Sequence, residues 1–119
     1  MNYEICYDER NELLRIRLLK DLTCEDAEPL VKNMEKLYTD KSRKYVLCEI
    51  ESGVTKMPDR ETRRVLAEQA KKVNWDKLAV VGATPAIRMA IKVITAVLGR
   101  ARTTKFCDNE QQALSWLEE

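Results

Sequence analysis

The stretch from Lys77 to Leu98, KLAVVGATPAIRMAIKVITAVL, constrains the fold more than any other part of the chain. Residues 78–81 form an unbroken apolar run, which is typical of a strand covered on both faces. Gly82 permits a sharp turn of the chain at the end of the strand, Thr84 is a suitable N-cap, and Pro85 fits the first position of a helix. The stretch therefore predicts a buried strand, a tight turn and a helix.

The predicted helix, residues 86–98, is apolar around most of its circumference. Ten of its thirteen residues are apolar, whereas a helix that faces one core needs only an apolar stripe. Arg88, Lys92 and Thr95 are its only polar residues, and their spacing places them on one face. The opposite flank exceeds what one sheet should cover, and it consists of Met89, Val93, Ala96 and Val97.

Two alternating segments near the N-terminus predict a hairpin. Apolar and polar residues alternate over residues 3–7 and 13–19, at the period of a half-buried strand. The residues between them are polar, and we expect Asn11 to adopt the left-handed conformation in the turn.

A first helix follows the hairpin. One face of it is apolar and consists of Ala27, Leu30, Val31, Met34, Leu37 and Tyr38. Pro29 constrains where this helix begins, because a proline deep in a helix removes a hydrogen bond. We therefore expect Asp26 to be the N-cap in preference to Thr23, since Pro29 then falls in the first turn.

The remaining pattern completes an α/β arrangement. Residues 45–50 predict a second buried strand, and Asp59 begins a helix. The inner face of this helix is expected to consist of Thr62, Val65, Leu66, Gln69, Ala70 and Val73. Residues 102–107 predict a polar edge strand, and Asp108 with Gln111 resembles a capping box before the terminal helix. The order β-β-α-β-α-β-α-β-α predicts a single domain over residues 1–119, with a mixed sheet of about five strands.

Composition excludes several classes of function. The net charge is +1, there is no histidine, and the four cysteines lie far apart without metal-ligand spacing. The N-terminus lacks an apolar signal region, and no apolar run reaches the length of a membrane span. We expect a cytoplasmic protein with reduced thiols, no metal, no cofactor, no nucleic-acid partner and no stable membrane insertion.

Charge is nevertheless uneven along the chain. Residues 60–105 carry eleven Lys and Arg against three acidic residues, a net charge of +8. Solvated helix faces paired with acidic neighbours are the favoured interpretation, and an anion-binding face is the alternative. No pair of groups suited to acid–base or nucleophilic catalysis emerges, so we expect no enzyme activity.

Several packing motifs resemble a known family. They lie in LAVVGATPAIR, TTKFCD and NEQQALSWLEE, and the matching residues are Val80-Val81-Gly82, Phe106, Ala113-Leu114 and Trp116-Leu117. These stretches are similar to the SpoIIAA-like family of the STAS superfamily, and the resemblance covers nearly the whole chain. It implies a small α/β domain, related in shape to bacterial anti-sigma-factor antagonists and to lipid-exchanging CRAL-TRIO domains.

The resemblance also implies a docking region. In the antagonists, a partner kinase phosphorylates a hydroxyl at the start of a helix, and Asp59 stands in that place here. We therefore expect no phosphorylation switch there, but a protein-binding or regulatory module that docks its partner through this loop and helix. The docking residues we expect are Thr55, Met57, Asp59, Arg60 and Arg63.

Two further sites are candidates. Gly82, Thr84 and Arg88 could form a weak anion-binding turn, although a plain helix-initiating turn explains the first two. The apolar flank of residues 86–98 has three explanations: cover by the terminal helix and its Trp116, a homodimer interface, or a gate over a lipid or other apolar ligand. We rank self-association above lipid binding.

Overall fold

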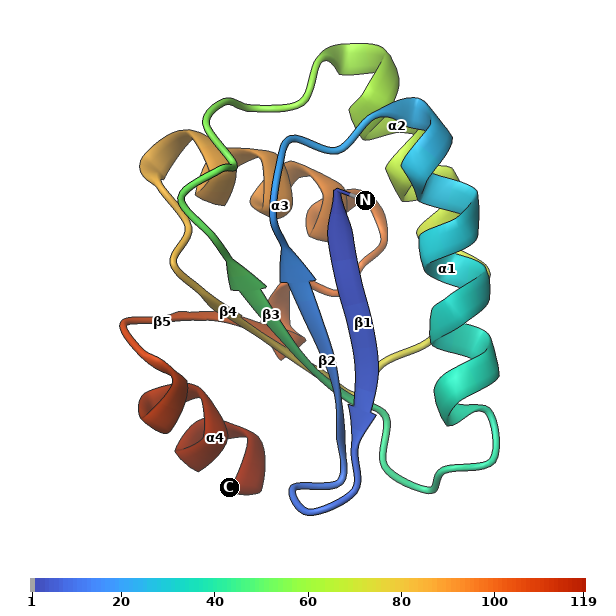
Figure 1. Ribbon diagram of the computed structural model, residues 1–119, viewed down its shortest axis with the longest axis vertical. Coiled ribbons are helices and arrows are strands. Elements are labelled where there is room, and N and C mark those ends of the chain that lie inside the picture. Colours follow the sequence, from blue (N-terminus) through green and yellow to red (C-terminus); the bar gives the residue numbers. More distant parts are fainter. Residues whose placement is uncertain (1) are drawn as a thin grey trace.

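Over residues 2–119, which the computed structural model describes, five strands form a mixed sheet in the order β1-β2-β3-β4-β5 (Figure 1). β1 and β2 are antiparallel, and the later neighbours are parallel. This confirms the predicted α/β fold with its N-terminal hairpin. The elements are β1 Tyr3–Asp8, β2 Leu13–Leu18, α1 Cys24–Tyr38, β3 Tyr45–Ile50, α2 Arg60–Ala70, β4 Lys77–Val81, α3 Pro85–Val97, the 3₁₀ turn η1 Ala101–Thr103, β5 Thr104–Cys107 and α4 Glu110–Glu118.

The strand, turn and helix from β4 to α3 form as the sequence predicts. Gly82 has a positive φ of 86°, and a Cβ at this position would lie 2.5 Å from the Ile50 carbonyl oxygen. The Thr84 side chain accepts a hydrogen bond from the Ile87 amide at 3.4 Å, and Pro85 is the first helical residue. Only glycine fits this turn, because both the backbone angle and the close approach exclude a side chain.

The helices cover the two faces of the sheet unequally. Figure 1 shows α1 and α4 on opposite sides of the strands. α1 packs on Ile16 and Val46, and α3 packs on the same face through Ile87 against Val80. α4 packs on the other face, where Ala113 and Leu117 meet residues such as Leu13, Leu47 and Ala79. Both faces of β3 and β4 are therefore buried, as expected for parallel strands.

The position of α4 overturns one explanation of the apolar flank of α3. The terminal helix and Trp116 lie on the far face of the sheet, so they cannot cover Met89, Val93 or Val97.

Thr95 of α3 does not lie on the exposed polar face that was predicted for it. It is 3% exposed and donates its hydroxyl proton to the Ile91 carbonyl at 2.9 Å, a bond that satisfies a buried hydroxyl.

The predictions for the hairpin turn, the cap of α4 and the length of the last strand were wrong. In the hairpin, Glu12 takes the positive φ of 54°, because Asn11 instead donates its amide and side-chain N–H groups to Asp8. α4 is capped by Asn109, which accepts from the Gln112 amide at 2.8 Å, and the capping box expected from Asp108 and Gln111 does not form. The last strand is also shorter than predicted, since residues 101–103 form a 3₁₀ turn.

α1 begins three residues earlier than predicted. Thr23 is the N-cap, and the Asp26 carboxylate accepts from the Thr23 amide at 2.8 Å and from its hydroxyl at 3.1 Å. Asn2 donates a further hydrogen bond to Asp26 at 2.8 Å. Pro29 therefore lies inside the helix, where its missing hydrogen bond is offset by this well-bonded first turn.

A charged network ties the hairpin to β3 and α4. Arg15 pairs with Asp8 at 2.8 Å, with Glu49 at 3.1 Å and with Glu110. The hydrogen bond from the Asn11 side chain, assisted by Arg15, lowers the pKa of Asp8 from 3.8 to about 2. Because the pKa of Asp8 is lower in the folded state, these contacts of its carboxylate stabilise the fold above pH 4, and the stabilisation is lost as the pH falls towards 2.

Within residues 2–119, no helix is long and apolar enough to cross a membrane.

We predict that Asp8→Asn lowers the free energy of unfolding by about 1 kcal/mol at pH 7, because Arg15 and Asn11 lose a charged acceptor. Urea titrations at pH 7 and pH 2 measure the effect. The difference between variant and wild type should shrink at pH 2, where Asp8 of the wild type is half protonated. A difference of equal size at both pH values would contradict the assigned role of the carboxylate.

Candidate docking surface

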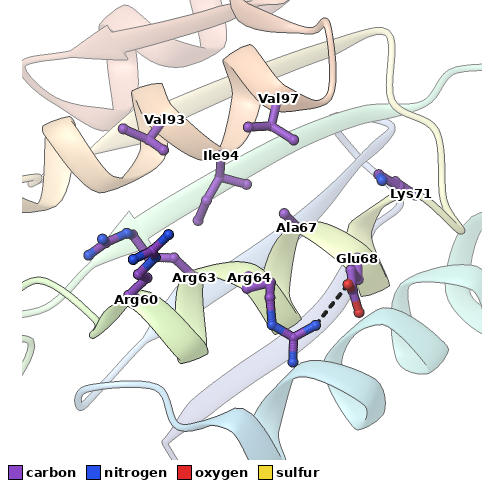
Figure 2. A pocket seen from close by; sticks show the side chains of 9 residues that line it. All are labelled: Arg60, Arg63, Arg64, Ala67, Glu68, Lys71, Val93, Ile94 and Val97. Carbon is purple, nitrogen blue, oxygen red and sulfur yellow. Dashed lines mark hydrogen bonds and ion pairs between the residues drawn. The ribbon is translucent and has the colours of Figure 1, made fainter.

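A groove between α2 and α3 brings together two sites that the sequence suggested separately (Figure 2). It has a volume of about 340 Å³ and runs between the basic side of α2 and the apolar flank of α3. Arg60 and Arg63 come from the predicted docking region, and Val93 and Val97 come from the predicted apolar flank. The lining residues are Arg60, Arg63, Arg64, Ala67, Glu68, Lys71, Val93, Ile94 and Val97.

The apolar side of the groove is exposed. Val93 is 44% exposed and Val97 is 63% exposed, and Met89, one helical turn before Val93, is 55% exposed. Ala96 is also exposed, although it does not line the groove. Large apolar side chains that recur every four residues form a continuous stripe on a helix. The flank predicted from composition therefore lies on the surface of the folded chain.

The basic side of the groove carries unbalanced charge. Arg64 pairs with Glu61 and, at 2.8 Å, with Glu68, so its charge is compensated within α2. Among the described residues, Arg60 and Lys71 have no carboxylate within ion-pair distance. The groove thus combines exposed valines with cations that are free to meet an acidic group.

Arg63 has a structural role as well. Its guanidinium donates to the Pro58 carbonyl oxygen at 2.7 Å, which ties α2 to the loop before it. Asp59 caps the same helix, since its carboxylate accepts from the Thr62 amide at 2.8 Å. This hydrogen bond lowers the pKa of Asp59. Asp59, which the resemblance predicted to stand in place of a phosphorylated hydroxyl, is thus a helix cap in this structure.

The other predicted docking residues lie outside the groove. Thr55 is held by Asp21, whose carboxylate accepts from the Thr55 amide at 2.9 Å and from its hydroxyl at 3.1 Å. Burial acts against the charged form of Asp21, but the amides of Thr55 and Lys56 outweigh it and lower the pKa. Met57 is half-buried and does not line the groove either. The loop is thus fixed by hydrogen bonds to Asp21.

The predicted anion-binding turn is occupied by hydrogen bonds within the chain. The oxygen of Thr84 caps α3, and Arg88 donates to the Ala83 carbonyl at 3.3 Å. The Arg88 guanidinium also lies 5.3 Å from the centroid of the Phe106 ring, and the Lys92 ammonium lies 5.9 Å from it. Over residues 2–119, no group of three His, Cys, Asp or Glu side chains is placed to hold a metal ion.

Some residues of this surface were not predicted from the sequence. Ala67 and Ile94 face each other across the groove, and Asp21 fixes the loop from a distant part of the chain. Ala67 could have been found as a small residue between the cations Arg64 and Lys71 on one face of α2. Asp21 had no such signal, because its partner is 34 residues away.

The fold is that of a STAS domain. A variant of RsbS, a STAS-domain protein from Moorella thermoacetica, superposes on the chain with a TM-score of 0.61. The match covers 99% of this chain and 96% of the RsbS chain, at 16% sequence identity. The likeness confirms the fold that the SpoIIAA-like resemblance implied.

The chain belongs to the family described as "Domain of unknown function (DUF7793)". The family model matches residues 8–119, which is nearly the whole chain. No curated protein matches the sequence.

We predict that Asp59→Ala lowers the melting temperature by about 4 °C, because the first turn of α2 loses its side-chain acceptor. Asp59→Asn is the matched control, since asparagine caps helices equally well, and it should melt close to the wild type. Differential scanning calorimetry measures both. Equal melting of the alanine variant and the wild type would show that the cap contributes nothing.

Proposed function

We propose that the chain is a regulatory, non-enzymatic module that binds a protein partner through the groove between α2 and α3. The observation that carries this proposal is the exposure of Val93 and Val97 beside the unpaired cations Arg60 and Lys71. Apolar side chains that remain exposed in contiguous patches are typical of interaction sites. The fold shared with RsbS supports a regulatory role. The free cysteines are consistent with the reducing environment of the cytoplasm.

The chemistry of the groove suggests the complementary partner surface. Burying Val93 and Val97 requires apolar side chains from the partner, while Arg60 and Lys71 favour carboxylates at the rim. Opposite charges at the rim mainly speed association and select among partners, and the apolar centre supplies most of the affinity. An acidic segment with an apolar face meets both requirements.

Self-association is a second candidate, carried by α3 alone. Met89, Val93 and Val97 form a stripe that a second copy of α3 could cover. A symmetric dimer would place the same patch of both copies in contact. Such a dimer would be centred on α3, because pairing the α2 sides would bring the cations of two copies together.

The lipid-carrier alternative gains no such support. The apolar space between the sheet and the helices has a volume of about 160 Å³. Pockets for ligands of ordinary size begin at roughly 300 Å³, so this space is too small for an acyl chain with its headgroup.

We predict that a negative charge introduced on either side of the groove abolishes partner capture. Wild-type protein immobilised on resin is compared with Lys71→Glu and Val97→Glu in a lysate of the source cells. Lys105→Glu is the control, since Lys105 is an exposed lysine on β5, outside the groove. A partner at this site should be retained by the wild type and the control and lost by both groove variants. Equal retention by all four proteins would contradict the proposal.

We predict that self-association, if it occurs through α3, depends on Met89. Multi-angle light scattering should then give the wild type twice the chain mass of 13.8 kDa, and Met89→Glu should give a monomer. Lys105→Glu should remain dimeric. A wild type that is monomeric at all concentrations, or a dimeric Met89→Glu variant, would exclude this interface.

A further inference from the structure

An apolar cavity of about 160 Å³, open to solvent at its mouth, lies between the sheet and the helices α1, α2 and α3. Its floor comes from β2, β3 and β4, with residues such as Ile16, Cys48 and Val80. Its roof comes from the helices, with residues such as Leu66 and Ile94. The cavity is separate from the docking groove, although Ile94 lines both.

The wall of this cavity offers almost no polar group. The Thr95 hydroxyl is engaged by the carbonyl oxygens of Ile91 and Lys92, at 2.9 and 3.3 Å. Burial raises the pKa of the Cys48 thiol to about 12, so this sulfur stays neutral. The indole nitrogen of Trp75 is buried and has no acceptor among the described residues. The wall therefore presents apolar atoms and at most one free donor.

Water is a poor occupant of such a space. A buried water needs two to four polar partners, and the wall does not supply them. Enclosed apolar cavities of similar volume, roughly 150 Å³, take up benzene or xenon in other proteins. Any part of the cavity that water does not fill leaves its lining atoms without van der Waals partners, so a ligand of matching size would supply those contacts.

We propose that this cavity binds a small uncharged apolar molecule, about the size of one aromatic ring. A charged ligand is excluded by this chemistry, because its charge would be buried without a partner. Leu22, Leu66 and Ile91 in the wall are only half-buried, so a small molecule has a short route to the interior. The site does not depend on the proposed docking function, since its ligand would bind a monomer without any partner.

Titration of isotope-labelled protein with benzene, followed by amide chemical shifts, tests the proposal. Saturable shifts should appear at Leu66, Trp75 and Ile94 around the cavity. The amide of Ala113 on the far face of the sheet should not move. Benzoate, which has the same ring and a negative charge, should produce no saturable shift. Shifts that stay linear to the solubility limit of benzene, or equal binding of benzoate, would overturn the proposal.

Variants of the wall locate the binding. Ala70→Leu adds a larger side chain to the roof and should abolish saturable binding, because the new side chain takes the space. Cys48→Met fills the floor and gives the same test if the first variant does not fold. Leu114→Ala removes a half-buried apolar side chain under α4, on the far face, and should bind benzene like the wild type. Binding that survives in a folded filling variant would place the ligand elsewhere and overturn the proposal.

Discussion

Burial of both faces of β3 and β4 is the constraint on which the rest of the structure depends. Val46 and Val80 are about 1% exposed on one face, and Leu47 and Ala79 are fully buried on the other. Strands of this kind must be covered on both sides. α1 and α3 cover the first face, so α4 is required on the second, which leaves the outer flank of α3 without a cover from this chain.

The surface that results is both apolar and cationic. Val93 and Val97 remain exposed because the only side of α3 that meets the sheet carries Ile87. The unpaired cations of α2 lie across the groove from them (Figure 2). Ile94 lines both the groove and the apolar cavity, so the docking surface and the cavity share one side chain.

The order of elements and the turn from β4 into α3 could be predicted, because both depend on local patterns. Apolar runs and alternation fix the period of each element, and Gly82, Thr84 and Pro85 act on their immediate neighbours.

Predictions failed where a polar side chain had two possible hydrogen-bonding roles. Asn11 was expected to bend the turn but bonds to Asp8, and Thr95 was expected on a polar face but bonds to the backbone of its own helix. A local pattern cannot choose between such alternatives.

The sequence by itself determined the fold class, the helix from Thr84 onward and the surplus of apolar residues on it, because these follow from residue type and spacing. Only the tertiary structure decided what that surplus faces. The sequence pattern alone would allow α4 and Trp116 to cover the apolar flank of α3. In the structure, β5 pairs beside β4, and the chain then continues to the other face of the sheet, where α4 packs. The groove, the cavity beneath it and the clamp of Asp21 on Thr55 join segments far apart in sequence, and their geometry exists only once the sheet has formed.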